Sequence, residues 1–550
     1  NALAAAFNEQ TVKVTNTQSV SNYLTVNGGI TLQLNAGANL QISPSGRLLV
    51  YGTLNVNGTS SFHIPLDGLN NARSGITNAM VVVAGGGTAN IQYADFKNAG
   101  YGLTLWYNSN TVTVQNCSFT NYGFDFDSKA LTVYSSTGNV TVNNNSFTGS
   151  NSLGIGIYSY NTGTNVSISN NTIIYGTKGI QCYSSNAMLT GNNIQNNYYY
   201  GIQTDNLLEY GAVYRNNNIR SNGYGISLNA ASPWIVGNTI IYNGRNVFIT
   251  SSSPNFAELP NGGNPGPGNN VIAISASPLV DIQNSSFPFF GYYSASAQGG
   301  YNSFYDTDLP HMRAQYNSGV WADVNYWSEG GPANYYDGTS WIRSLYPLYY
   351  DPNPYPLAKT SQVFISQNSK SLQTSSTNST NTGLDSAIAE GFKGNYNKAK
   401  QILKLFVDNK PSDNFSPLAL LLFYDFSKIE SHKDTSARIK NHNEFSVLMD
   451  GLKSKNANHP LRPFAFRLLA RDAAITKDYI KANALYDELL NIYPNSRYEL
   501  ATLYDKVMFL IEVDNDLTKA KELVAKMVAN YPKDELTVMG RIAIGEKVDF

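Results

Sequence analysis

A short phrase recurs along the first half of the chain, in which one or two polar residues, usually Asn, precede an aromatic or β-branched residue. Six copies end at Phe96, Phe119, Phe147, Ile173, Ile194 and Ile219, and a seventh, weaker copy ends at Ile240. Successive copies are 23, 28, 26, 21, 25 and 21 residues apart. A period of about 24 residues is typical of a protein built from stacked repeats.

A second phrase follows each first phrase, seven to ten residues downstream in six copies and twelve in the copy after Phe119. Its copies are Gly102-Leu103, Ala130-Leu131, Gly156-Ile157, Gly179-Ile180, Gly201-Ile202, Gly225-Ile226 and Asn246-Val247. Each repeat therefore holds short β-rich runs separated by Gly and Asn, and none is long or periodic enough for a helix.

These short runs predict a right-handed parallel β-helix, because a single repeat cannot bury its apolar side alone. Coils stacked at about 4.8 Å would place Phe119 over Phe147 and Ile173 over Ile194. Asn suits the corners, since it tolerates left-handed backbone angles and its amide can form a ladder with Asn in the next coil. We interpret the Asn clusters as structural.

Charge divides the chain into two regions. Residues 1–359 hold 12 Lys/Arg and 15 Asp/Glu, whereas residues 360–550 hold 25 and 23. We predict an N-terminal segment or cap over 1–23, the β-helix over 24–358, a Ser/Thr-rich linker over 359–383 and helical repeats over 384–550. The total charge is nearly balanced, so we expect neither a nucleic-acid partner nor attraction to an anionic membrane.

The predicted linker has the composition of a flexible segment. It contains an Asn-x-Ser/Thr sequon at Asn378, which is the most accessible of the sequons in this chain. We predict N-glycosylation at Asn378 and O-linked sugar on neighbours such as Thr377 and Ser379.

The chain looks exported. Two cysteines, Cys117 and Cys182, exclude a disulfide framework, and their expected separation of several coils makes them buried free thiols. The opening at residues 1–6, Asn-Ala-Leu-Ala-Ala-Ala, resembles what remains after signal-peptide cleavage. No apolar run reaches the ~20 residues of a membrane-spanning helix. We expect a secreted, extracellular or cell-surface protein of bacterial or archaeal type.

Two stretches resemble secreted β-helix proteins. The run Gly29-Ile30-Thr31-Leu32-Gln33-Leu34 and the similar runs up to Thr59 resemble their opening coils. Asn325-Tyr326-Trp327-Ser328 resembles the Asn-Tyr-Trp-Gly signature that often closes the solenoid in the pectin-lyase-like superfamily, with Ser in place of Gly. That superfamily includes lyases, hydrolases, epimerases, adhesins and non-catalytic proteins, so the fold alone does not give the function.

Catalytic candidates are few. A hydrolase needs paired carboxylates, but the family's hydrolase pattern is missing from the predicted solenoid, and no His occurs between His63 and His311. Asp125 and Asp127 lie i,i+2 on an expected strand and so share a face. Asp205 and Glu209 form a looser pair. Solvated carboxylates are the simpler interpretation of both pairs, and we expect no metal or other cofactor.

Aromatic side chains suggest glycan binding as an alternative, since sugar rings stack on such faces. The candidates are Tyr198, Tyr199, Tyr200 and Trp106. The competing interpretation is that these rings cover the flank of the solenoid or contact a neighbouring chain.

Beyond the linker the period changes from two to 3.6 residues. Segments starting near Tyr396, Tyr479 and Leu517 share a spacing in which Ala399, Ala482 and Ala520 precede apolar residues and a final Pro. These segments resemble tetratricopeptide repeats, in which a small residue packs at the helix crossing. A degenerate copy is expected between Ser416 and Pro460, with helices near 417–429 and 443–453. Such arrays bind peptides or other domains.

Three functions fit this sequence. The leading one is a non-catalytic structural or interaction protein of the cell surface or extracellular matrix, which self-associates into a filament or layer or binds other cell-surface proteins, with the β-helix as a rigid spacer and the helices as the assembly module. The alternatives are a carbohydrate-active enzyme, either a polysaccharide lyase or a hydrolase, and a glycan-binding adhesin.

Overall fold

The computed structural model describes residues 10–354 and 386–548 with internal gaps. The gaps are 72–74, 76–77, 125–127, 151–152, 208–210, 259–264, 294–296, 306–309, 329–331, 333, 388–389, 391–394, 414–415, 417–418, 421–422, 425, 428–434, 477, 495–497, 533 and 547. The predicted linker over 359–383 and the sequon at Asn378, with Thr377 and Ser379, lie outside the described residues. The chain forms two compact units, residues 1–248 with 274–277 and 541–550, and residues 249–273 with 278–540.

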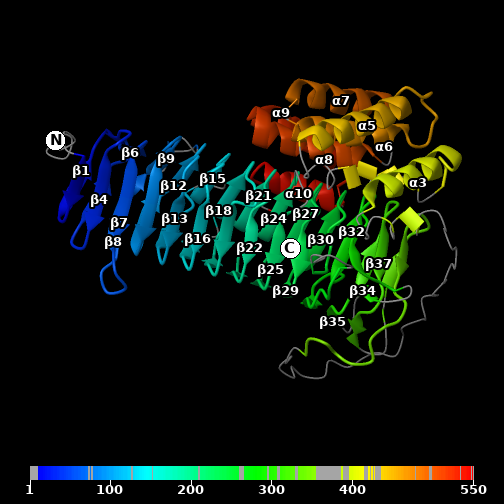
Figure 1. The fold of residues 1–550 in the computed structure, drawn as a ribbon, viewed down its shortest axis with the longest axis horizontal. Coiled ribbons are helices and arrows are strands. Elements are labelled where there is room, and N and C mark those ends of the chain that lie inside the picture. Colours follow the sequence, from blue (N-terminus) through cyan, green and yellow to red (C-terminus); the bar gives the residue numbers. More distant parts are fainter. Residues whose placement is uncertain are drawn as a thin grey trace. The chain divides into compact units, whose positions relative to one another are not determined.

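The strands form a parallel β-solenoid whose long sheets we call A, B and C (Figure 1). Sheet A contains β1 (Thr11–Val14), β4 (Thr31–Asn35), β7 (Thr53–Asn57), β10 (Thr88–Gln92), β13 (Val112–Gln115), β16 (Val140–Asn143), β19 (Val166–Ser169), β22 (Met188–Thr190), β25 (Val213–Arg215) and β28 (Trp234–Val236). Sheet B contains β2 (Thr17–Val20), β5 (Asn39–Ile42), β8 (Ile64–Asn71), β11 (Ala94–Ala99), β14 (Ser118–Tyr122), β17 (Ser146–Gly149), β20 (Thr172–Ile174), β23 (Asn193–Gln195), β26 (Asn218–Arg220), β29 (Thr239–Asn243), β31 (Val271–Ser275), β35 (Ser303–Tyr305) and β38 (Tyr326–Trp327).

Sheet C completes each coil, and a smaller sheet follows late in the chain. Sheet C contains β3 (Tyr23–Val26), β6 (Arg47–Val50), β9 (Val81–Ala84), β12 (Tyr101–Trp106), β15 (Lys129–Tyr134), β18 (Ile155–Tyr160), β21 (Lys178–Tyr183), β24 (Tyr200–Asp205), β27 (Tyr224–Asn229), β30 (Arg245–Thr250), β32 (Val280–Gln283), β36 (Met312–Ala314) and β39 (Asn334–Tyr336). The four-stranded sheet contains β33 (Phe289–Tyr293), β34 (Ala297–Gly299), β37 (Gly319–Ala322) and β40 (Trp341–Arg343).

The predicted stacking is confirmed in the first unit. Phe119 pairs in register with Phe147, and their rings stack with centroids 4.5 Å apart. Ile173 pairs with Ile194. The solenoid starts earlier than predicted, because β1 and β2 already pair with β4 and β5, so residues 11–20 belong to the first coil.

The predicted asparagine ladder is also confirmed, at the corner between sheets A and B. The side-chain Nδ2 of each Asn donates to Oδ1 of the Asn in the next coil at 2.9–3.0 Å, through Asn145, Asn171, Asn192, Asn217 and Asn238. The preceding corner residue has positive φ and is Asn or Gly, the residues that adopt this conformation most readily. Each coil is therefore tied to the next by buried amides.

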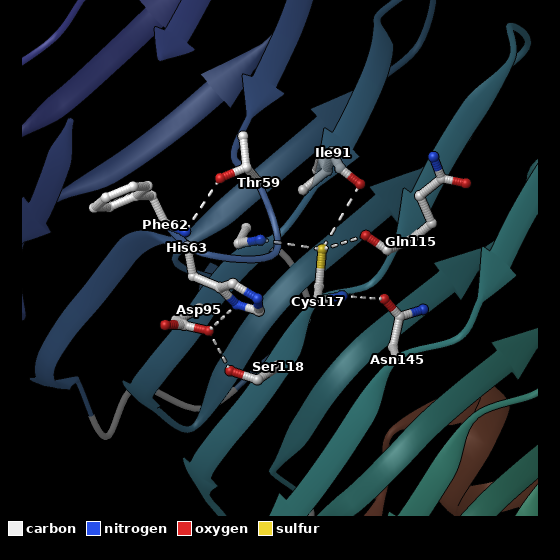
Figure 2. Close-up of polar contacts among 10 residues, drawn as sticks. Thr59, Phe62, His63, Ile91, Asp95, Gln115, Cys117, Ser118 and Asn145 are labelled. Carbon is white, nitrogen blue, oxygen red and sulfur yellow. Dashed lines mark hydrogen bonds and ion pairs between the residues drawn. The ribbon is translucent and has the colours of Figure 1, made fainter. Parts of the chain in front are cut away.

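Cys117 occupies the ladder position one coil before Asn145. Its thiol contacts the carbonyl oxygens of Ile91 and Gln115, and its backbone N–H donates to Asn145 Oδ1 at 2.9 Å (Figure 2). Cys117 and Cys182 are free and buried, as predicted. Burial raises the pKa of each thiol to about 12, because the thiolate loses its hydration.

The second unit contains further strands and the helices. The described helices are α3 (Tyr396–Asn409), α5 (Thr435–Lys453), α6 (Arg462–Ile475), α7 (Tyr479–Ile492), α8 (Glu499–Phe509), the π-helix η4 (Leu510–Asp514), α9 (Leu517–Asn530) and α10 (Glu535–Ala543), whose last residues belong to the first unit. Ala399, Ala482 and Ala520 are fully buried, as the repeat spacing predicted. Helix α5 begins earlier than the predicted start at residue 443. The tetratricopeptide identity remains a resemblance.

The helices of the second unit are not separate from its strands. The Arg467 Nε of α6 donates to the buried Asp505 of α8 at 2.8 Å, and Arg471 Nη1 donates to the carbonyl oxygen of Ser251, just after β30, at 3.0 Å. Burial lowers the pKa of Arg471, an effect that the nearby Asp505 opposes. This contact attaches the helical array directly to a solenoid turn in the same unit.

The predicted closing motif lies in the second unit as well. Asn325 Oδ1 accepts hydrogen bonds from the backbone N–H and the Nδ2 of Asn302. Asn302 Oδ1 in turn accepts hydrogen bonds from the backbone N–H and the Nδ2 of Asn270. Trp327 stacks on Phe304 with centroids 4.5 Å apart. The motif continues an amide ladder and an aromatic stack of the solenoid.

Candidate functional site

Several predicted site residues fall in gaps of the structure. Asp125, Asp127 and Glu209 lie outside the described residues, as do the glycosylation candidates. Their roles stay predictions.

The structure brings three other candidates, Trp106, Tyr200 and Asp205, to the outer face of sheet C in the first unit. Trp106 and Asp205 lie in one column of register partners, Trp106, Tyr134, Tyr160, Tyr183 and Asp205, which runs across five strands. Tyr200 lies in a second column, which starts at Tyr101. The predicted residues therefore belong to one surface rather than to separate sites.

Glycine in the second sequence phrase determines which residues face outward. A Cβ on Gly179 would lie 2.5 Å from the side chain of Ile194 in the core, and a Cβ on Gly156 would lie 2.6 Å from that of Ile173. The glycine and the following Ile thus both face inward, which is the geometry of a bulge. As a result, the residue before each glycine turns outward.

The outward column at this position contains three cations and three tyrosines. Its members are Tyr101, Lys129, Ile155, Lys178, Tyr200, Tyr224 and Arg245. Lys129 is 5% exposed, and its Nζ lies 5.3 Å from the ring centre of Tyr101 and 4.9 Å from that of Tyr158. Buried ammonium groups on an outer face are held here by aromatic faces, which attract cations.

The middle outward column is polar and buried. It contains Thr104, Thr132, Tyr158, Gln181, Gln203 and Ser227. Four of these have a buried polar atom without a hydrogen-bond partner among the described residues, namely Thr104 Oγ1, Thr132 Oγ1, Gln203 Oε1 and Ser227 Oγ. Such atoms are costly to bury.

The third outward column is an aromatic stack that ends in a carboxylate. Trp106 stacks on Tyr134 with centroids 5.1 Å apart, Tyr134 on Tyr160 at 4.5 Å and Tyr160 on Tyr183 at 5.7 Å. At the Trp106 end the stack is half-buried, and Tyr107, which packs edge-on against Trp106, is 53% exposed. Asp205 is fully buried, and its Oδ2 accepts from Gln203 Nε2 at 2.9 Å.

Two of the three consecutive tyrosines do not offer free rings, whereas Tyr198 is half-buried and its hydroxyl donates to the carbonyl oxygen of Val548 at 3.5 Å. Tyr199 and Tyr200 are 2% and 1% exposed. The hydroxyl of Tyr199 donates to the carbonyl oxygen of Glu546 at 2.8 Å and accepts from the backbone N–H of Val548 at 3.1 Å. In this conformation neither ring can stack on a sugar, and the last described residues of the first unit lie against Tyr199 instead.

Sequence reasoning missed the cations and the middle column. A signal was present, since the residue before each copy of the second phrase is Tyr, Lys, Ile, Lys, Tyr, Tyr or Arg. Reading that position across the repeats would have found Lys129 and Lys178.

The outward positions of sheet C hold cations, amides, hydroxyls and aromatic rings. The described residues contain no group of three or more His, Cys, Asp or Glu that could hold a metal ion. Within the same described ranges, no helix is long and apolar enough to cross a membrane.

Comparison with known proteins supports the fold. The family model "Right handed beta helix region" matches residues 54–206 and 102–258. Two solved structures are similar at 12% identity: a double mutant of the periplasmic alginate epimerase AlgG, covering 60% of this chain and 85% of its own with a TM-score of 0.25, and PfbA, a surface adhesin of Streptococcus pneumoniae, covering 60% and 88% with a TM-score of 0.22. No curated protein matches the chain. The family match confirms the predicted right-handed solenoid over the matched residues and assigns no activity.

Proposed function

We propose that this is a non-catalytic structural and interaction protein of the cell surface or extracellular matrix, which self-associates. The solenoid is its stiff scaffold, and the outer face of sheet C and the helices are its contact surfaces. The observation that carries this proposal is the aromatic stack on the outer face of sheet C, whose Trp106 end is half-buried and adjoins Tyr107, a ring that is 53% exposed. Large aromatic rings that stay partly exposed suit protein contacts better than contact with water.

The ladders of buried amides support the scaffold role. Each coil from Asn145 to Asn238 is fixed to the next by side-chain and backbone hydrogen bonds in addition to the β-sheet pairing. Cooperative networks of this kind resist local opening. A spacer that transmits force or sets a distance needs that property.

Microscopy of the full-length protein tests this function. Negative-stain images at rising protein concentration are expected to show filaments or ordered layers, with light scattering rising in parallel. A monodisperse monomer at all concentrations, together with turnover of an acidic polysaccharide that Asp125→Asn abolishes, would instead favour a carbohydrate-active enzyme.

Glycan binding is a second candidate, favoured by the exposed corner of the aromatic stack. Tyr107 has positive φ and packs edge-on against both Trp106 and Tyr134, which places an exposed ring beside two half-buried ones. Sugars stack on such platforms. Retention on an oligosaccharide array should be lost in Trp106→Ala/Tyr107→Ala and kept in Tyr175→Ala, a control in which another exposed tyrosine with positive φ is removed.

A further inference from the structure

The outer face of sheet B carries a compact charged cluster in the first unit. Most outward positions of this sheet are Ser, Thr, Asn or Gln, whereas Asp67 on β8 and Asp95 and Lys97 on β11 lie on neighbouring strands. In register, Asp67 pairs with Lys97, and Asp95 pairs with Ser118 of β14. This cluster lies on a different sheet from the candidate site described above.

His63 and Asp95 form a hydrogen-bonded pair. His63 Nδ1 lies 2.8 Å from Asp95 Oδ1, and the Ser118 hydroxyl donates to the same oxygen at 2.6 Å. Since an ionised carboxylate only accepts, Nδ1 carries a proton in this contact. The second oxygen, Asp95 Oδ2, accepts no hydrogen bond within the described part of the chain. About a third of each side chain is exposed.

An exposed aromatic ring adjoins this pair. Phe62 is 67% exposed at the end of a tight turn, where its N–H donates to the backbone oxygen of Thr59 at 3.0 Å and lies 3.2 Å from the Thr59 hydroxyl. Figure 2 shows Phe62, His63, Asp95 and Ser118 following one another from the upper left toward the bottom. His63 is fixed on its other side by an edge-on contact with Tyr93, whose centroid lies 5.5 Å away. The exposed face of this ring is available for stacking.

Asp67 keeps the cation of the cluster in place. Its carboxylate lies 3.4 Å from Lys97 Nζ and accepts from Asn98 Nδ2 at 2.9 Å and from the N–H of Leu69 at 3.0 Å. Burial acts to raise the pKa of Asp67, but these hydrogen bonds and the charge of Lys97 lower it overall. The carboxylate is therefore ionised at neutral pH, and Lys97 retains further N–H donors for a ligand.

We propose that Phe62, His63, Asp95 and Lys97 bind a neutral pyranose unit of a glycan. The open groups are the acceptor Asp95 Oδ2, the ring Nε2 of His63 and the donor Lys97 Nζ, which suit hydroxyls because each hydroxyl both donates and accepts. The face of Phe62 suits the C–H side of a sugar ring. Two carboxylates beside one lysine disfavour an acidic sugar. This site is independent of the function proposed above.

Ligand-observed NMR on the full chain tests the proposal. The probes are the methyl glycosides of glucose, galactose and mannose, measured by saturation transfer at millimolar concentration. At least one is expected to bind. Phe62→Ala and Asp95→Asn should each weaken its binding by about tenfold, the effect of losing one ring contact or one charged hydrogen bond.

Two controls separate this site from others. Arg220→Gln changes a charge on the same face of sheet B, and Tyr175→Ala removes an exposed ring outside the proposed site; both should leave the transfer signal unchanged. Circular dichroism verifies that each variant is folded. The proposal is overturned by absence of transfer to all three probes, or by wild-type binding in both Phe62→Ala and Asp95→Asn.

Discussion

Sheets B and C use the same coils but present different outer faces. In sheet C the outward positions hold tyrosines, lysines and glutamines that are almost fully buried, such as Lys129 and Tyr200. In sheet B they hold mostly small polar residues, and Lys97 and Asp95 remain partly exposed. The backbone pairing is parallel in both sheets, with register shifts at Lys97/Ala99 and Thr120/Tyr122 in sheet B. The strand register therefore determines which side chains form the core, whereas the outward side chains can differ from sheet to sheet.

The core that both sheets share gives the largest expected effect. Asn192→Ala removes hydrogen bonds to Asn217, Asn171 and the carbonyl oxygen of Ile168. It should lower the free energy of unfolding by about 4 kcal/mol, since several buried partners are left unsatisfied. The adjacent outward Asn193→Ala should cost under about 1 kcal/mol. Denaturant unfolding measures the loss of unfolding free energy in both variants. Equal losses would contradict the distinction between core-facing and outward-facing asparagines.

A matched lysine pair compares the two outer faces. Lys129→Ala on sheet C removes a buried cation between Tyr101 and Tyr158 and should cost about 2 kcal/mol. Lys97→Ala on sheet B removes a partly exposed ion pair with Asp67 and should cost below about 1 kcal/mol. Thermal unfolding of both variants tests this difference, which would vanish if the two faces were equivalent.

A smaller effect is expected where the C-terminal residues meet Tyr199. Tyr199→Phe keeps the ring but deletes the hydroxyl that contacts Glu546 and Val548. The local cost should be about 1 kcal/mol. Hydrogen exchange of the Val548 amide should become faster, while amides of β24 are unaffected. Unchanged protection of Val548 would mean that the hydroxyl does not hold this segment.

The two thiols should show no difference. Burial raises the pKa of both Cys117 and Cys182 to about 12, so both thiols are protonated in the native protein at pH 8. Their reaction with iodoacetamide should therefore be limited by the rate of local unfolding. The folded pKa lies above the reference value of 9.0, so each thiol contributes stability below pH 9 that is lost as pH rises toward 12. Rapid alkylation of either cysteine at pH 8 would show that its coil is open.

Sequence predicted the core of the solenoid because the same apolar phrase returns in every coil. Phe119, Phe147, Ile173 and Ile194 are adjacent in space for that reason. The first coil was missed because Thr11–Val20 lacks the phrase. The helices were found where a buried Ala and a terminal Pro repeat at one spacing.

The candidate surfaces were harder to predict from sequence. The outward side chains do not repeat regularly from coil to coil, so the sequence pattern did not identify Lys129 or His63 as site residues. Tyr199 was expected to be available for sugar, but residues more than three hundred positions later pack against it. Contacts between residues so far apart in the sequence depend on the tertiary path of the chain, which a local sequence pattern does not predict.

Cross-linking tests the register on which every face depends. Ser146 and Thr172 are outward partners in adjacent coils of sheet B. Their Cα atoms should lie about 4.8 Å apart, within disulfide range, whereas Ser146 and Asn193, two coils apart, should lie about 9.6 Å apart, beyond it. The account predicts a disulfide in Ser146→Cys/Thr172→Cys and none in Ser146→Cys/Asn193→Cys, by peptide mapping of the oxidised full-length protein. The reverse pattern would contradict it.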